Sequence, residues 1–84
     1  MATYERSRAW IVRAGESTTH VALDAWAHGQ ITVRVDTDLM TRITGLPKDR
    51  LCGVALTDLV NPAGITEREA DAHDWALPSA RSAA

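Results

Sequence analysis

Two segments show the alternation of apolar and polar residues that predicts half-buried β-strands. The first strand is predicted over residues 8–14, where Trp10 and Val12 share one face while Ile11 and Arg13 share the other. The second is predicted over residues 30–35, with its side chains alternating as follows: Ile31, Val33 and Val35 inward, Thr32 and Arg34 outward. We therefore expect these two strands to pair in a small sheet, with Trp10 buried.

The segment between the predicted strands, residues 18–28, has the pattern of a buried helix. At 100° per residue, its apolar side chains cover most of the circumference and leave one narrow polar stripe. That stripe consists of His20, Asp24 and His28. Gly29 follows at the position where a glycine commonly ends a helix. We expect this helix to pack on the two strands and expose only its polar edge.

The second half of the chain is predicted to be mainly helical. A short helical turn is expected from Asp36-Thr37-Asp38 to Ile43, before the break at Gly45-Leu46-Pro47, and residues 48–60 are expected to be helical in part. Thr66 and Glu69 have capping-box spacing, which predicts a helix to about Trp75. The predicted fold is therefore α+β: a small sheet of two or more strands packed by helices, with a helical C-terminal half.

Length and composition indicate one small domain. The chain has 84 residues, of which 45% are hydrophobic, so it falls in the range of globular proteins. Residues 1–77 are expected to form the domain, and residues 78–84 a disordered tail. There is no phenylalanine, and the three tryptophans are expected to fill much of the core.

Charge and cysteine content limit the possible partners and the cellular compartment. The net charge is −2, so there is no excess of basic residues that would indicate nucleic-acid or membrane binding. Residues 1–50 carry seven Lys or Arg against six Asp or Glu, whereas residues 51–84 carry two against five. Cys52 is the only cysteine and cannot form an internal disulfide. With no apolar leader at the start and no apolar run long enough for a bilayer, a cytoplasmic protein is expected.

The polar stripe on the predicted helix is the sharpest metal-like pattern. His20, Asp24 and His28 lie one helical turn apart, and two imidazoles with a carboxylate can share a divalent ion. Successive steps of four residues drift by about 40°, so three ligands over two turns seldom converge. The alternative is the solvated edge of a buried helix, and we expect neither a metal nor another cofactor. The sequence contains no recognisable nucleophile motif, so we do not expect an enzyme.

Arginines on the predicted strands suggest a contact with DNA. If the strands pair, Arg13 and Arg34 lie on one outward face, where guanidinium groups can bind phosphate. Thr32 shares that face with Arg34. Scattered surface arginines are the alternative interpretation.

One part of the chain combines the segment Trp10-Ile11-Val12-Arg13-Ala14-Gly15-Glu16, the later His28-Gly29 step, the strand Ile31–Val35 and Asp38-Leu39. This combination resembles the N-terminal domain of Mrr-like restriction endonucleases, which is related to PUA and EVE domains. The resemblance covers residues 8–51. It implies a non-catalytic, DNA-associated module that acts with a nuclease or another protein partner. Arg34-Val35 stands where that family has a glycine-tryptophan pair, and its later strands are not recognisable. The chain is therefore expected to be a truncated or diverged relative, and oligomerisation is expected to cover its exposed apolar surface.

Two shorter resemblances compete. Residues 43–62 look like the helical middle of a PAS sensor domain, which implies a sensory or protein-interaction module. Residues 31–39 look like the strand of a ribbon-helix-helix repressor, in which Thr32 and Arg34 would face the major groove. A diverged fragment without independent activity is the remaining hypothesis.

Overall fold

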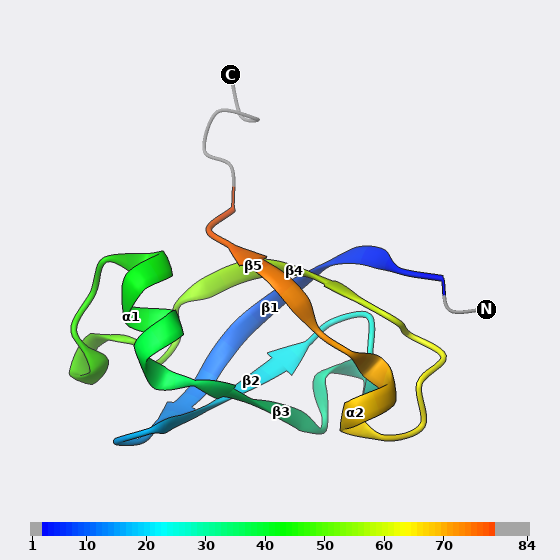
Figure 1. Ribbon diagram of the computed structural model, residues 1–84, viewed down its shortest axis with the longest axis horizontal. Helices are drawn as coiled ribbons and strands as arrows, with labels where there is room; N and C mark the ends of the chain where they lie inside the picture. The colour runs from blue at the N-terminus through cyan, green and yellow to red at the C-terminus, as the bar shows by residue number, and fades with distance from the viewer. Residues whose placement is uncertain (1–2, 79–84) are drawn as a thin grey trace.

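The computed structural model describes residues 3–78, which form a curled antiparallel sheet of five strands with short helices between them (Figure 1). The strand order is β3-β2-β1-β4-β5. The elements in chain order are β1 Glu5–Ala14, β2 Thr18–Leu23, the 3-10 turn η1 Ala27–Gly29, β3 Thr32–Asp36, α1 Thr37–Thr44, the 3-10 turn η2 Lys48–Arg50, β4 Ala55–Val60, α2 Glu67–Ala70 and β5 His73–Ala76.

Strand β1 is the spine of the sheet because it pairs on both edges. Its first part, Glu5–Trp10, pairs with β4, and its second part, from Ala9 onward, pairs with β2. Between Ile11 and Arg13 the register with β2 shifts by one residue, which marks a β-bulge. Bulges bend a strand and increase its twist, so this one helps the sheet to curl.

The core fills the inside of the curled sheet. Alternate residues of the strands point inward, and α1 and the loops before β4 and β5 add further apolar side chains. The buried cluster consists of Ala9, Ile11, Val21, Leu23, Trp26, Val33, Met40, Leu51, Leu56, Val60 and Ala70. Trp26 is buried as expected, and its indole N–H donates a hydrogen bond of 2.8 Å to the Gly64 carbonyl. That bond ties the loop after β4 to the core.

The helix predicted over residues 18–28 is wrong, since this segment contains strand β2 and the short turn η1. Thr19, Val21 and Leu23 alternate into the core, and β-branched residues favour the pleated strand. Ala22 is also buried, on the other face of β2, so the apolar residues seemed to surround a helix. A strand buried on both faces lacks the clean alternation that identifies strands.

The predicted environment of Trp10 is also wrong. Its side chain is 40% exposed, and it pairs with Ala22 of β2 and Ala55 of β4. The strand predicted over residues 30–35 does exist as β3, but it pairs with β2 because β2 lies between it and β1. Within this segment Val33 is buried, whereas Ile31 precedes the strand and is 57% exposed.

The short helix predicted before Gly45 is confirmed as α1, and Gly45 ends it in the left-handed conformation, with φ of 73°. The capping box of Thr66 and Glu69 is confirmed as well. The helix that it begins stops at Ala70, because Asp71 turns left-handed and the chain continues as β5 rather than as helix to Trp75. Local capping therefore fixes where this helix starts but not its length.

The expected helical C-terminal half is overturned by strands β4 and β5. In residues 48–60 only η2 is helical, and the rest of the segment leads into β4. Residues 43–62, which look like the helical middle of a PAS domain, thus include a central strand. Residues 31–39 include β3 and the first turn of α1, and β3 pairs with β2 of the same chain. The expected tail falls largely on residues 79–84, outside the described part of the chain.

No helix among the described residues has the length and apolar character that crossing a membrane requires. The two α-helices lie at opposite ends of the sheet in Figure 1, and β5 runs between them. Both helices place a buried residue in the core, Met40 of α1 and Ala70 of α2, whereas the turn η1 lies against Trp10 on the other side of the sheet. We call that side, opposite the core, the outer face.

Candidate binding site

Strand register brings Arg13, His20 and Arg34 into one row across the outer face. Arg13 lies opposite His20 on β2, and His20 lies opposite Arg34 on β3. Directly opposed residues in antiparallel strands point to the same side of a sheet. At a strand spacing of about 4.8 Å, the Cα atoms of the two arginines are roughly 10 Å apart.

The bulge in β1 is what places Arg13 in this row. A regular strand would put Arg13 on the same face as Ile11, which is buried in the core. The extra residue Val12, 46% exposed, reverses that alternation. The prediction that Ile11 and Arg13 share one face is therefore wrong. The register does place Arg13 and Arg34 on the same side of the sheet.

A second row on the outer face carries an aromatic platform. Trp10 lies opposite Ala22, and Ala22 lies opposite Thr32. The small residues Ala22 and Gly29 leave room for the indole: a Cβ added to Gly29 would be only 2.7 Å from Trp10 Cη2. The two rows meet at His20, whose Nδ1 is 3.5 Å from the Thr32 hydroxyl. An exposed aromatic ring thus lies on the same face as the Arg13 row.

Within residues 3–78, ion pairs engage several cations of the sheet but do not include Arg13. Across residues 3–78, the four ion pairs join Arg6 to Asp74, Arg8 to Asp24, Arg34 to Glu67 and Lys48 to Glu16. Arg13 is exposed and belongs to none of them. Exposed pairs of this kind contribute little stability and exchange partners readily. Arg13 is therefore the cation on the outer face that is most available to an anionic ligand.

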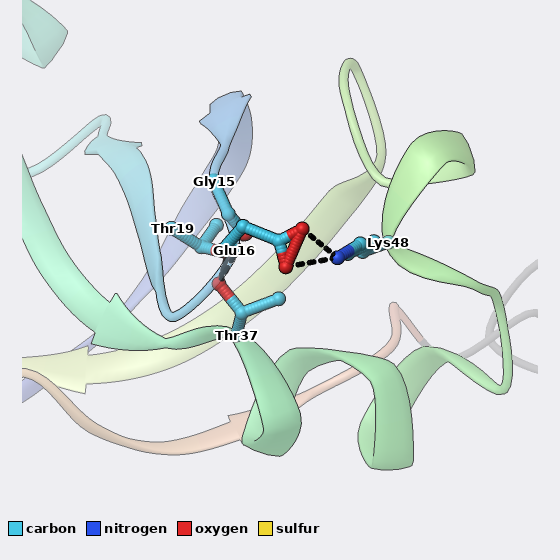
Figure 2. A network of polar contacts seen from close by, with 5 residues as sticks. All are labelled: Gly15, Glu16, Thr19, Thr37 and Lys48. Carbon is cyan, nitrogen blue, oxygen red and sulfur yellow. Dashed lines mark hydrogen bonds and ion pairs between the residues drawn. The ribbon is translucent and has the colours of Figure 1, made fainter.

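A polar network fixes the turn at the end of β1, beside Arg13 (Figure 2). The Thr37 hydroxyl donates to the Gly15 carbonyl at 3.0 Å, so its single proton is used. The Thr19 hydroxyl must then donate to the Thr37 oxygen, 2.8 Å away. Lys48 adds an ion pair with Glu16 on the same turn. The network holds the turn against the start of α1 and so gives the Arg13 end of the row a defined position.

A groove runs between β3 and the α2–β5 segment, at the open side of the curled sheet. Its volume is about 320 Å³, and it is lined by Val33, Arg34, Val35, Glu67, Arg68, Asp71, Ala72 and Trp75. The Glu67 carboxylate crosses the groove to the edge of β3, where one oxygen accepts the Arg34 backbone N–H at 2.9 Å. The other oxygen lies 3.4 Å from Arg34 Nε. Arg34 thus belongs to the outer-face row through its register and to the groove through its side chain.

The candidate metal residues are not brought together. His20 lies on β2, Asp24 follows that strand and pairs with Arg8, and His28 lies in η1 with a positive φ of 53°. Among the described residues, no three His, Cys, Asp or Glu side chains are grouped as ligands for an ion. His20, Asp24 and His28 would share one edge only on a helix, and the segment is not helical. Cys52 is exposed, and its thiol donates to the Val12 carbonyl at 3.2 Å.

Asp58 on β4 is an unusual group that was not identified from the sequence. It is completely buried on the core side, opposite Ser7 of β1, and neither carboxylate oxygen has a hydrogen-bond partner within the described residues. Burial raises the Asp58 pKa from 3.8 to about 6, and the charges of Arg6 and His73 oppose part of that rise. Its position in an alternating segment, Ala55-Leu56-Thr57-Asp58-Leu59-Val60, was the available signal, once that segment is recognised as a strand.

Comparisons with known proteins identify no relative: no protein-family model, no curated protein and no solved structure matches this chain. The resemblance to the N-terminal domain of Mrr-like endonucleases therefore stays an expectation drawn from residues 8–51. Function has to be argued from the outer face and the groove themselves.

Proposed function

We propose that this protein is a non-catalytic, DNA-associated module that binds single-stranded DNA on its outer face. The observation that carries the proposal is that the bulge at Val12 puts Arg13, which has no ion pair within residues 3–78, on the same face as the exposed Trp10 ring. Proteins that bind single strands combine aromatic side chains, on which bases stack, with cations that follow the phosphates. The relation to restriction-system N-terminal domains remains part of this proposal.

Each residue of the outer face has a definite role in this proposal. Trp10 offers its ring to a base, and Arg13 contacts a phosphate. His20 and Thr32 supply hydrogen-bonding groups between the two arginines. Arg34 contacts the next phosphate after it gives up its exposed ion pair with Glu67, a pair in which the arginine side chain is 70% exposed.

The architecture supports this choice of surface. Partly open five-stranded barrels that bind oligonucleotides do so on the face of strands 2 and 3 and on the loops beside it. Here β2 and β3 carry His20, Thr32 and Arg34, and the loop containing α2 lies next to β3.

An unpaired strand fits this surface better than a duplex. The exposed base-stacking ring is of no use against a base pair that remains stacked in its helix. The net charge of −2 also provides no general attraction to duplex phosphates. Binding must then come from the local patch and be weak at high salt.

A fluorescence-anisotropy titration tests the proposal. Labelled single-stranded and duplex DNA of the same sequence are titrated with the full chain at several salt concentrations. The proposal predicts saturable binding of the single strand that weakens as salt rises, with the duplex bound more weakly. No binding of the single strand at low salt, where phosphate contacts are strongest, would rule the proposal out.

A further inference from the structure

Among the described strands, none pairs with the edge of β3 that faces the groove. Across residues 3–78, β3 pairs only with β2, so its other edge has no strand against it. In an antiparallel pair, the backbone groups of every second residue point away from the partner strand. Arg34 is such a residue, since its N–H donates to Glu67 and not to β2. Free edges of this kind accept an added strand.

Glu67 holds a carboxylate against this edge in a two-point contact. The Arg34 backbone N–H and its guanidinium Nε approach the two oxygens at 2.9 and 3.4 Å. A backbone N–H together with a guanidinium is a carboxylate-binding arrangement. Arg68 lines the same groove and adds a second cation to it, and across the described residues it has no ion pair.

The rest of the groove is suited to an apolar side chain. Val33, Val35, Ala72 and Trp75 line it beside the Arg34 contact, and their side chains are buried or partly buried. A volume of about 320 Å³ is enough for the end of a peptide but not for a large ligand. The groove therefore offers three complementary features: a strand edge, a carboxylate contact and an apolar wall.

We propose that this groove binds the C-terminal end of an extended peptide, which lies along β3 with its terminal carboxylate on Arg34. The Glu67 carboxylate occupies the place of that terminal group in the free protein, and the arriving peptide displaces it. The last side chain of the peptide packs on Val33, Ala72 and Trp75. This site shares Arg34 with the proposed nucleic-acid surface but does not include Trp10 or Arg13.

The experiment uses the ¹⁵N-labelled full chain and its Glu67→Gln variant, each titrated with the tripeptide N-acetyl-Val-Ala-Leu carrying a free carboxylate. NMR chemical shifts are followed at the Arg34 amide and the Trp75 indole. Because Glu67→Gln removes the competing carboxylate, the variant should bind about tenfold more tightly than the wild type, the effect of one charged contact. The same peptide with a C-terminal amide should bind at least about tenfold more weakly.

Two controls give the test its specificity. Arg34→Ala should abolish the shifts, whereas Arg13→Ala, which changes the outer face, should leave them intact. The proposal is overturned if millimolar peptide leaves the Arg34 amide of Glu67→Gln unchanged or if the amidated peptide binds equally well. It is also overturned if inorganic phosphate moves the same resonances and the peptide does not.

Discussion

The indole ring of Trp10 lies against Gly29, with no space for a side chain between them. A Cβ at Gly29 would be 2.7 Å from Trp10 Cη2 and 3.1 Å from Cζ2, and the Gly29 φ of +75° also disfavours other residues. The glycine that was predicted to end a helix therefore serves the outer face, where it lets the Trp10 ring approach the backbone of η1 closely. This contact connects the backbone of a loop to the proposed base-stacking surface.

Gly29→Ala should destabilise the protein and move Trp10. We expect a loss of about 2–4 kcal/mol in the free energy of unfolding, from left-handed strain and from overpacking against the ring. Urea denaturation measures the loss. Gly45→Ala is the matched control: it has a similar φ of +73° but no atom within 4 Å of the added Cβ, so only the strain of about 1–2 kcal/mol applies. Equal losses in the two variants would contradict the Trp10 contact.

Asp58 should make the protein less stable as the pH rises. Its pKa is higher in the folded protein, about 6, than its ordinary value of 3.8, so the folded state holds the proton more tightly. The stabilisation is complete below pH 3.8 and is lost as the pH rises through about 6. The difference corresponds to as much as about 3 kcal/mol.

The Asp58→Asn variant isolates this contribution from other carboxylates, such as Glu16, whose pKa is lowered by Lys48 and whose effect has the opposite sign. The free energy of unfolding of both proteins is measured by urea denaturation between pH 4 and 8. Wild type and variant should be similar at pH 4, and the variant should be more stable at pH 8. A difference that does not change with pH would show that Asp58 keeps an ordinary pKa.

The Thr37 hydroxyl should contribute measurably to stability because it bonds the buried Thr19 hydroxyl and the part-buried Gly15 carbonyl. Thr37→Val removes the acceptor of Thr19 and the donor to the Gly15 carbonyl. Leaving these groups without partners should lower the free energy of unfolding by about 1–3 kcal/mol. Thr37→Ser keeps the hydroxyl and should lose less than half of that amount. If thermal or urea denaturation finds the two variants equal, the network in Figure 2 is not what holds this turn.

Sequence reasoning succeeded where local chemistry decides the structure. Alternation revealed β1 and β3, the Gly45 stop ended α1, and the Thr66 capping box began α2. It failed where tertiary contacts decide. Segment 18–28 looked helical because apolar residues occupy both faces of β2, and Ala22 is buried between Trp10 of β1 and Thr32 of β3, a pairing that the segment alone does not reveal.

The candidate site was predictable only in outline. Arg13, Arg34 and Thr32 were identified from their positions on strands, and the structure places all three on the outer face. They reach this face in a different way from the one expected: β2 lies between β1 and β3, and the bulge at Val12 turns Arg13 outward. A bulge of one residue has no signature in this sequence. The exposure of Trp10 was missed because alternation does not show which face of β1 meets the core, and that face carries Ile11.

The central claim is that Arg13 on the outer face binds an unpaired nucleic-acid strand. The most direct test compares Arg13→Ala with Arg42→Ala, an exposed arginine near the end of α1, in the same anisotropy titration with a single-stranded oligonucleotide. Both variants lose one positive charge, so a general effect of net charge would weaken them equally.

Our account predicts that Arg13→Ala lowers the affinity about tenfold and reduces the dependence of log affinity on log salt by about one unit, as expected for one lost phosphate contact. Arg42→Ala should bind like the wild type. Equal affinities and equal salt slopes for the two variants would contradict the account.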